Sequence, residues 1–369
     1  MRSSIIIDNK AAREAKAGEL WFPAASVVGR RPKLPGIARL LDRRRRFVAL
    51  AFLSPDSPHY LRVISLQDST VDFAFWRERF ERALARRKRL FDVTDAYRVL
   101  FGESDGIPSV IVDRYADVVS FEIGCSGALS IRKEIIKIIE ELLSPRAIVE
   151  NSDAVVKGEE ARTVVREGDQ RFEVDALSGQ KTGAYLDYRP MRFAARDLAR
   201  GDCLDAFCYQ GWFSCHIAGF AKSVIAVDSS QPALDAAAKN AAMNGHNNIE
   251  LVRADAFEYL KGCKRKFDFI HLDPPAMAKR RQDIAAAIRK YEKAVSDSLT
   301  ALKPNGILMI SACSQKITQR MIEQVFESAS KGSGRPHEIV WQGIQDIDHP
   351  TLRGHSESLY LKAGAARFA

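Results

Sequence analysis

Side chains able to bind a polar ligand, and one able to act as a nucleophile, follow a series of short apolar runs in the second half of the chain. Asp205, Asp228, Asp255 and Asp273 lie at or beside the ends of four such runs, and Cys313 follows a fifth. Carboxylates accept hydrogen bonds from hydroxyl and amino groups, and a thiolate is a nucleophile. In an open α/β sheet, ligands bind at the carboxyl ends of the strands. We therefore take these ends together as one candidate site.

Two of the carboxylates have the positions expected for adenosine binding. Asp228 lies just over 20 residues after the first strand end, where an acidic side chain usually accepts from ribose hydroxyls. Asp255 can accept from an adenine amino group, and Ala256 and Phe257 offer apolar cover. Each aspartate has a second interpretation, because Asp commonly caps the helix that follows a strand.

The first strand end carries one glycine only. The segment Asp205-Ala206-Phe207-Cys208-Tyr209-Gln210-Gly211 opens a helix but is not G-x-G-x-x-G, so a dinucleotide-dependent dehydrogenase is disfavoured. Gly211 alone is also compatible with a plain tight turn.

The fourth and fifth strand ends carry the candidate catalytic residues. In Asp273-Pro274-Pro275 the two prolines restrict the backbone, so we expect the Asp273 carboxylate to point rigidly into the cleft. Cys313, in Ser311-Ala312-Cys313-Ser314, places a thiol beside it. The alternative is that Cys313 is one more buried strand cysteine.

The elements that position these residues alternate between strand and helix, which predicts a mostly parallel sheet covered on both faces. Helical patterns lie at 231–244 and 282–302, and an antiparallel pair is predicted at the sheet edge, from Glu338–Ile344 and Ser358–Lys362. The parallel strands are predicted at Cys203–Phe207, Ser223–Val227, Ile249–Arg253, Phe267–Leu272 and Ile307–Ala312.

Two smaller modules precede this sheet. After a polar start, short apolar runs predict a β-rich module, and a basic helix at about 73–91 leads into a small α/β module that ends near residue 177. The predicted domains are therefore 1–72, 73–177 and 178–369. The first module's strands are expected at Ser26–Val28, Phe47–Phe52 and Tyr60–Leu66; the second module is expected to contain strands at Tyr97–Phe101, Ile107–Asp113, Val118–Ile123 and Ala147–Glu150 and a helix at Ser130–Leu143.

The positive charge is concentrated in the front of the chain. The whole chain has a formal charge of +9, whereas residues 1–91 hold 20 basic and 9 acidic side chains, a net charge of +11. Two runs dominate, Arg43–Arg46 and Arg86–Arg89. Five of these eight side chains would be enough for a phosphate-binding face, which favours nucleic-acid contact. A solvated helix surface is the alternative.

Composition excludes several other classes. The apolar runs are far shorter than the ~20 residues that span a bilayer, and Met1–Lys10 lacks a secretory pattern, so we expect a cytoplasmic protein. Six cysteines contain no C-x-x-C pair, and His216 has no partner at zinc-finger spacing, so no metal site is predicted.

The ordered set of strand ends resembles the class I S-adenosylmethionine-dependent methyltransferases. The segment Gly179 to Arg189, which contains Gln-Lys-Thr-Gly and Leu-Asp-x-Arg, resembles the signature of the ribosomal RNA large subunit methyltransferase I family, as do Asp348-His349-Pro350 and Leu359–Lys362. The resemblance implies a small β-rich PUA-like domain, a small α/β middle domain and a Rossmann-like domain with a mostly parallel seven-stranded sheet. The implied cofactor is S-adenosylmethionine, with contacts from Asp205, Phe207, Tyr209, Gly211, Asp228, Asp255, Ala256, Asp273, Tyr185, Asp187 and Arg189.

The resemblance also implies 5-methylcytosine formation in 23S rRNA. Cys313 is expected to add to carbon 6 of the base. Asp273, protonated or hydrogen-bonded near N3, is expected to orient and activate the cytosine. The base that removes the carbon 5 proton is open; Asp187 and a held water are candidates. A homodimer is also left open.

Three other functions are kept as alternatives. The first two are methylation of an exocyclic amine, although Ala276 cannot stack on a flipped base, and methylation of uracil at carbon 5. The third is a non-catalytic RNA-binding or ribosome assembly factor. This hypothesis is based on two departures from the family: Ala184 lies where the family usually has an aromatic residue, and Tyr188 lies where it usually has a glutamine.

Overall fold

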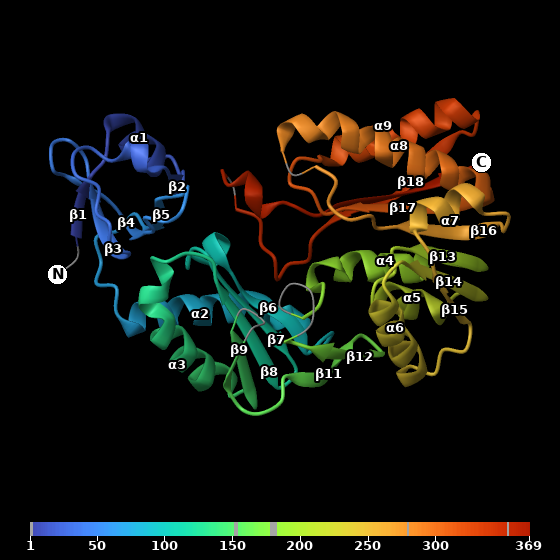
Figure 1. Ribbon diagram of the computed structural model, residues 1–369, viewed down its shortest axis with the longest axis horizontal. Helices are drawn as coiled ribbons and strands as arrows, with labels where there is room; N and C mark the ends of the chain where they lie inside the picture. Colours follow the sequence, from blue (N-terminus) through green and yellow to red (C-terminus); the bar gives the residue numbers. More distant parts are fainter. Residues whose placement is uncertain (1–2, 151–153, 178–182, 279, 353) are drawn as a thin grey trace. The chain divides into compact units, whose positions relative to one another are not determined.

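The computed structural model describes residues 3–150, 154–177, 183–278, 280–352 and 354–369 (Figure 1). Its contacts divide the chain into two compact units. The first unit contains Met1–Glu167, Val174–Leu186 and Ile347–Ser358, and the second contains Gly168–Glu173, Asp187–Asp346 and Leu359–Ala369. No described helix is both long enough and apolar enough to cross a membrane.

The N-terminal part of the first unit is a five-stranded sheet with the order β1-β3-β4-β5-β2. Alternating apolar residues such as Ala38, Leu40 and Phe22 fill its core. Helix α1 packs here through Ala11 and Ala15. The elements are β1 (Ser3–Ile6), α1 (Asn9–Lys16), β2 (Trp21–Phe22), β3 (Gly36–Leu41), β4 (Phe47–Leu53) and β5 (Leu61–Ser65).

Part of this sheet was not predicted correctly. The polar start contains β1 and α1, and Asp8 caps α1 by accepting a hydrogen bond from the Ala11 amide at 2.8 Å. The strand predicted at Ser26–Val28 is wrong, because Val27 forms only an isolated bridge to Ile7 after a 3₁₀ turn. The predictions of β4 and β5 are confirmed within one or two residues.

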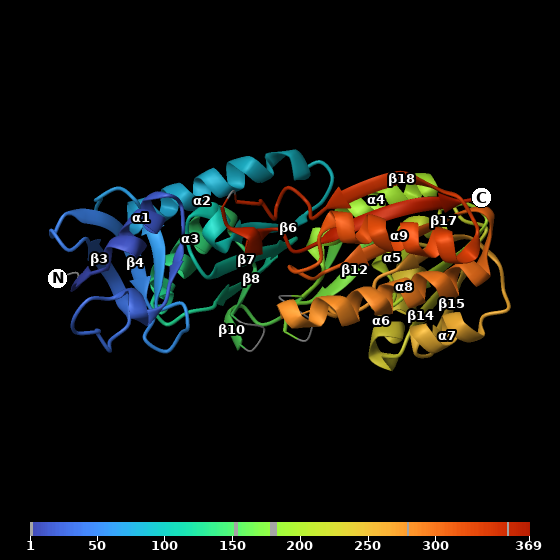
Figure 2. The same cartoon turned by 90° about the horizontal axis from the view of Figure 1, so that it is seen from above.

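The second sheet of this unit has the order β10-β9-β8-β7-β6, with β8 and β9 parallel. Trp76 and Phe80 of α2 and Ile135 and Ile139 of α3 share one apolar core with strands β6–β8, beside which both helices lie (Figure 2). The elements are α2 (Phe73–Arg87), β6 (Ala96–Phe101), β7 (Val110–Tyr115), β8 (Val118–Ile123), α3 (Arg132–Leu143), β9 (Ala147–Glu150) and β10 (Ala154–Lys157); β11 (Arg162–Glu167) and β12 (Gln170–Asp175) form a two-stranded sheet.

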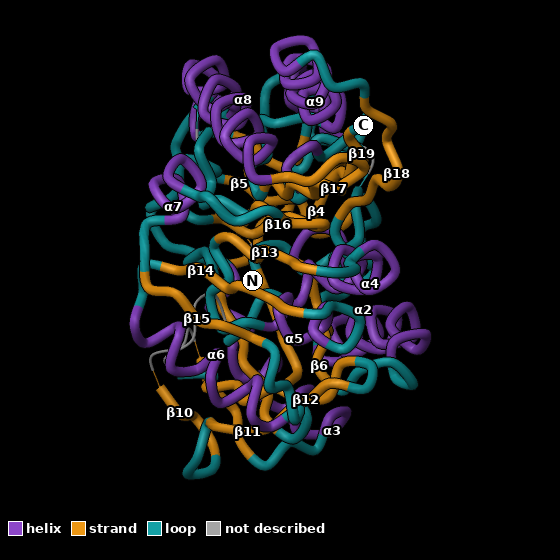
Figure 3. The backbone as a smooth tube through the Cα atoms, turned by 90° about the vertical axis from the view of Figure 1, so that its right-hand side faces the viewer, coloured by secondary structure: helices purple, strands orange, loops and turns teal. Residues whose placement is uncertain are grey.

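The second unit confirms the predicted seven-stranded, mostly parallel sheet, with the order β15-β14-β13-β16-β17-β19-β18. Helices α7, α8 and α9 cover one face, and α4, α5 and α6 the other (Figures 1 and 3). The strands are β13 (Asp202–Ala206), β14 (Ser223–Asp228), β15 (Ile249–Arg253), β16 (Phe267–Leu272), β17 (Leu302–Ala312), β18 (His337–Ile344) and β19 (Lys362–Phe368); the helices are α4 (Arg189–Leu198), α5 (Trp212–Ala218), α6 (Gln231–Met243), α7 (Ala256–Gly262), α8 (Ile284–Ala301) and α9 (Gln319–Ser333).

The antiparallel edge pair is confirmed, but its second strand is not at Ser358–Lys362. Tyr360 and Leu361 donate their amide hydrogens to the side-chain oxygen of Gln345, both at 3.1 Å. These amides are therefore used outside the sheet ladder. The ladder starts at Lys362, which pairs with Ala312 and Ile344, so β19 runs from Lys362 to Phe368.

Candidate active site

The candidate site lies at the carboxyl ends of β13, β14, β15, β16 and β17. Strand order reverses beside β13, because the chain continues to β14 and β15 on one side and to β16 and β17 on the other. Ligands of open α/β sheets bind at such a reversal. The structure therefore gathers the sequence-predicted strand-end residues along one edge of the second unit.

The loop after β13 is held in an unusual backbone conformation. Phe207, Tyr209 and Gly211 have φ values of +67°, +49° and +72°. The amides of Phe207 and Cys208 both donate to the carbonyl of Val227 at 2.9 and 3.0 Å, which ties the loop to β14. A Cβ atom at residue 211 would lie 2.9 Å from the Cβ of Ala237. Glycine is therefore required there by both conformation and space.

Asp228 joins the first two strand ends. One oxygen accepts from the Tyr209 amide and the other from the Ser230 amide, both at 2.9 Å. The N-cap of α6 is Ser230 and not Asp228, so the capping alternative is not the role of Asp228. Each carboxylate oxygen can accept a further hydrogen bond, so the residue fits the predicted ribose contact.

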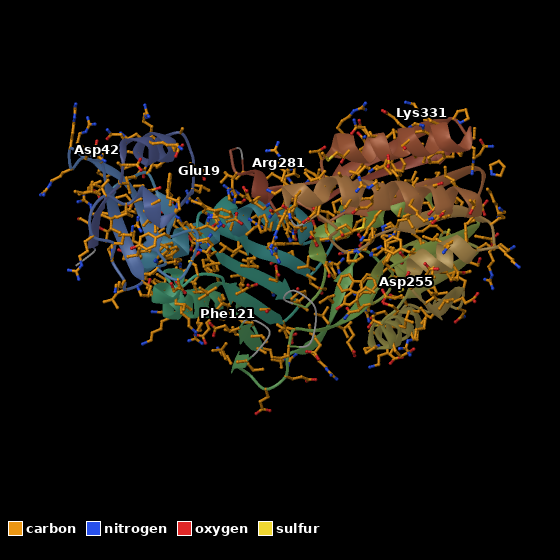
Figure 4. The ribbon with its side chains drawn as sticks, turned by 45° about the horizontal axis from the view of Figure 1, so that its top comes forward. Glu19, Asp42, Phe121, Asp255, Arg281 and Lys331 are labelled. Atoms are coloured by element: carbon orange, nitrogen blue, oxygen red, sulfur yellow. The ribbon has the colours of Figure 1, made fainter. Side chains whose placement is uncertain are left out.

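Asp255, labelled in Figure 4, does cap a helix, since it accepts from the Glu258 amide at 3.0 Å at the start of α7. Its side chain is exposed, and its contact with adenine stays a prediction. Beside it, the rings of Phe257 and Phe207 pack edge to face with 5.0 Å between centroids, while Ala256 is buried. The first and third strand ends thus share an apolar wall.

Asp205 is buried beneath these ends. Its two oxygens interact with His271 Nδ1 at 2.9 Å and with Ser214 Oγ at 2.5 Å. The ring of Phe213 stacks on His271 with 3.5 Å between centroids. His271 is not among the residues predicted from the sequence, although a histidine inside the apolar run Phe267–Leu272 is a signal for a buried polar contact. The predicted contact of Asp205 with the cofactor stays a prediction.

Asp273 lies next to Tyr188, and Tyr188 interacts electrostatically with both Asp273 and Cys313. The Tyr188 hydroxyl donates to Oδ1 of Asp273 at 2.8 Å. Burial raises the pKa of Asp273 to about 6, although His271 and the Tyr188 hydrogen bond oppose the rise. Burial, followed by the negative charges of Asp273, Cys313 and Asp187, raises the pKa of Tyr188 well above its ordinary value. The carboxyl, the phenol and the thiol therefore share one electrostatic environment.

The segment before α4 is also anchored. The Tyr360 hydroxyl donates to Oδ2 of the buried Asp187 at 2.6 Å, and Arg189 forms a buried ion pair with Asp346. These contacts fix both predicted residues, and their cofactor roles stay predictions. Tyr185 belongs to the first unit, and Gly179 to Thr182 of the signature lie outside the described residues. Across the residues that the structure describes, no three metal-ligating side chains cluster.

The basic runs of the first unit are only partly on the surface. Arg87 is fully buried, where it pairs with Asp105 and donates to the carbonyls of Arg98 and Asp348. Arg86 also pairs with Asp105, and Arg46 with Asp42. In the described part of the chain, the exposed members of the two runs with no ion-pair partner are Arg43, Arg44, Arg45, Lys88 and Arg89. Side chains ending in nitrogen project outward beside Asp42 (Figure 4).

Comparison with known proteins identifies the family. Residues 5–66 match a PUA-like domain, and residues 199–353 match a methyltransferase domain. The ribosomal RNA large subunit methyltransferase of Deinococcus radiodurans is 35% identical over 98% of this chain and 96% of its own length. The ribosomal RNA large subunit methyltransferase I of Alteromonas mediterranea is 31% identical over 98% of each chain. The chain belongs to the ribosomal RNA large subunit methyltransferase I family.

A solved structure shares the fold of this chain. The structure of SMU.776 in complex with SAH aligns with a TM-score of 0.85, at 22% identity, over 99% of this chain and 100% of that one. The predicted PUA-like domain, the Rossmann-like methyltransferase fold and S-adenosylmethionine as cofactor are confirmed. The anchored Asp228 fits that cofactor, since each of its carboxylate oxygens can accept a further hydrogen bond beside the strand ends.

Proposed function

We propose that this enzyme methylates carbon 5 of a cytosine in 23S rRNA through a covalent adduct with Cys313. The family places it among S-adenosylmethionine-dependent methyltransferases of large-subunit rRNA. The observation that supports the finer assignment is that Asp273 and Cys313 follow the paired strands β16 and β17 and both act electrostatically on Tyr188, which donates to Asp273. An rRNA substrate implies a cytoplasmic enzyme.

The proposed roles of the cofactor-binding residues follow from the strand ends. Asp228 accepts from the ribose hydroxyls, Asp255 accepts from the adenine amino group, and Phe207 with Phe257 covers the adenine. Bound S-adenosylmethionine supplies an electrophilic methyl group. The other predicted contacts are Tyr185, Asp187, Arg189, Asp205, Tyr209, Gly211, Ala256 and Asp273.

Carbon 5 of cytosine is a weak nucleophile, and the proposed covalent adduct increases its electron density. The Cys313 thiolate forms a bond to carbon 6, and the electron pair displaced from the ring moves toward N3, where Asp273 donates a proton. Carbon 5 then has the electron density of an enamine, and this electron density forms the bond to the methyl group as the methyl–sulfonium bond breaks and its bonding pair stays on the sulfur. Loss of the carbon 5 proton to a base restores the double bond as the sulfur–carbon 6 bond breaks, and N3 returns its proton to Asp273.

The exposed arginines of the first unit are proposed to bind rRNA phosphates. In this proposal residues 1–72 form the RNA-binding domain, 73–177 the middle domain and 178–369 the methyltransferase domain. Arg43, Arg44 and Arg45 lie at the turn between β3 and β4. Each phosphate contact releases counterions, so the contribution does not depend on base sequence.

The test uses unmodified 23S rRNA transcribed in vitro and compares Cys313→Ala with Cys263→Ala, a control at a half-exposed thiol after α7. We expect Cys313→Ala to lose methyl transfer while its calorimetric affinity for S-adenosylmethionine stays within a fewfold. The control should form 5-methylcytosine, identified by mass spectrometry of nucleosides, at the wild-type rate. Full activity of Cys313→Ala would overturn the covalent adduct, and methylated amine or uracil would overturn the assigned base.

A further inference from the structure

Tyr188 is a buried hydrogen-bond donor to the proposed active-site carboxyl. It ends the short 3₁₀ turn Leu186–Tyr188 directly before α4, and only 5% of its surface is exposed. Its hydroxyl lies 2.8 Å from Oδ1 of Asp273. Because burial and three nearby negative groups disfavour the phenolate, Tyr188 keeps its proton and donates a hydrogen bond to this carboxyl.

This contact makes the two oxygens of Asp273 unequal. An oxygen that already accepts a phenol hydrogen is the less favourable place for the carboxyl's own proton. In the protonated form, the proton therefore resides on Oδ2. Asp273 then presents one donor, Oδ2–H, and one acceptor, the second lone pair of Oδ1.

A donor beside an acceptor matches the pairing edge of cytosine. N3 of cytosine accepts, and its neighbouring 4-amino group donates; in uracil N3–H donates and the neighbouring oxygen accepts. With Oδ2 facing N3, cytosine makes both hydrogen bonds. Uracil would need the proton on Oδ1, which Tyr188 disfavours.

We propose that Tyr188 is a specificity-determining positioning residue, which orients the proton of Asp273 so that the site takes cytosine and rejects uracil. This inference rests on the proposed function and deepens it. His271, Asp205 and Asp187 also act electrostatically on Asp273. All three remain in a Tyr188→Phe variant, so that variant isolates the phenol.

The first measurement follows the Asp273 carboxyl directly, without substrate. Carbon-13 NMR titration of the aspartate carboxyls, assigned with Asp273→Asn, reports the pKa of Asp273 in wild type and in Tyr188→Phe. We expect the pKa to rise in the variant by roughly one unit, since the lost hydrogen bond favoured the ionised form. Tyr60→Phe is the control, because Tyr60 donates to the Pro32 carbonyl in the first unit. An unchanged Asp273 titration in Tyr188→Phe would overturn the positioning role.

The second measurement compares methyl transfer to 23S rRNA transcripts that carry cytidine or uridine at the mapped target. We expect Tyr188→Phe to lower the ratio of kcat/KM for cytidine over uridine by about tenfold, the effect of one misplaced buried hydrogen bond. Tyr188→Gln, which keeps a donor, should recover part of the ratio. A wild-type ratio in Tyr188→Phe would overturn the specificity role. If the wild type transfers no methyl group to cytosine, the proposed function and this specificity role are both wrong. The titration then still tests whether Tyr188 donates to Asp273.

Discussion

Nδ1 of His271 lies 2.9 Å from Oδ1 of Asp205 inside the sheet of the second unit. Both residues are at least 98% buried, and the other oxygen of Asp205 accepts from Ser214 of α5. These residues lie on the central strands β13 and β16, beneath the strand-end loops. The layer under the candidate site is therefore polar and held by hydrogen bonds.

Removing the Asp205 carboxylate should destabilise the protein. Asp205→Ala leaves His271 and Ser214 without their acceptor in a buried layer, so we expect the free energy of unfolding in urea to fall by about 2–4 kcal/mol. The control is Asp235→Ala on the exposed side of α6, which should change it by less than about 0.5 kcal/mol. Equal stabilities would mean that the buried pair contributes nothing to the fold.

This layer illustrates what the sequence can and cannot predict. Periodicity and strand ends located β13 to β17, because buried parallel strands are continuous apolar runs. The partner of Asp205 was not predictable, since the pairing depends on the register in which β13 lies beside β16. Likewise, the contact between Tyr188 and Asp273 joins residues 85 positions apart.

Asp273 should make the stability of the enzyme depend on pH. The pKa of Asp273 is about 6 in the folded protein, whereas the ordinary pKa of an aspartate is 3.8. The raised pKa means that wild-type stability is full below about pH 4 and falls as pH rises to about 6. Asp273→Asn stays neutral and keeps an acceptor for Tyr188. We therefore expect Asp273→Asn to be more stable than wild type at pH 8 by about 1–3 kcal/mol.

The measurement is urea-induced unfolding of both proteins at pH 5, 6, 7 and 8. The difference should grow from pH 5 to 6 and become constant at higher pH. Asp235→Asn serves as the control and should run parallel to wild type. A difference that shrinks with rising pH would contradict the raised pKa of Asp273.

Asp255 can be tested for cofactor binding apart from its capping role. Serine caps helices about as well as aspartate, so Asp255→Ser keeps the start of α7 but removes the carboxylate. If Asp255 accepts from adenine, S-adenosylmethionine affinity measured by calorimetry should fall by about tenfold. Asp228→Ala should weaken binding at least as much. Wild-type affinity of Asp255→Ser would leave Asp255 with the capping role alone.

In the basic runs, a count of charges overestimates the number of positively charged side chains that lie on the surface. Arg86–Arg89 reads as four equivalent charges, yet the helical turn points Arg87 inward, where it pairs with Asp105. That partner lies 18 residues further along the chain, in another element. Arg43, Arg44 and Arg45 lie in a turn and are exposed. The run between β3 and β4 is therefore the better-supported part of the proposed RNA-binding surface.

Arg43, Arg44 and Arg45 should dominate the salt dependence of RNA binding. Replacing all three by alanine should weaken binding of the 23S rRNA transcript and reduce the slope of log Kd against log salt by roughly two, at about 0.7 per lost phosphate contact to unpaired RNA. The charge-matched control replaces Lys222, Lys239 and Lys261, which are exposed on the second unit. Filter binding between 50 and about 300 mM salt separates the two. Because the control removes the same net charge, equal slopes in both triple variants would attribute RNA affinity to overall charge and contradict a dedicated arginine surface.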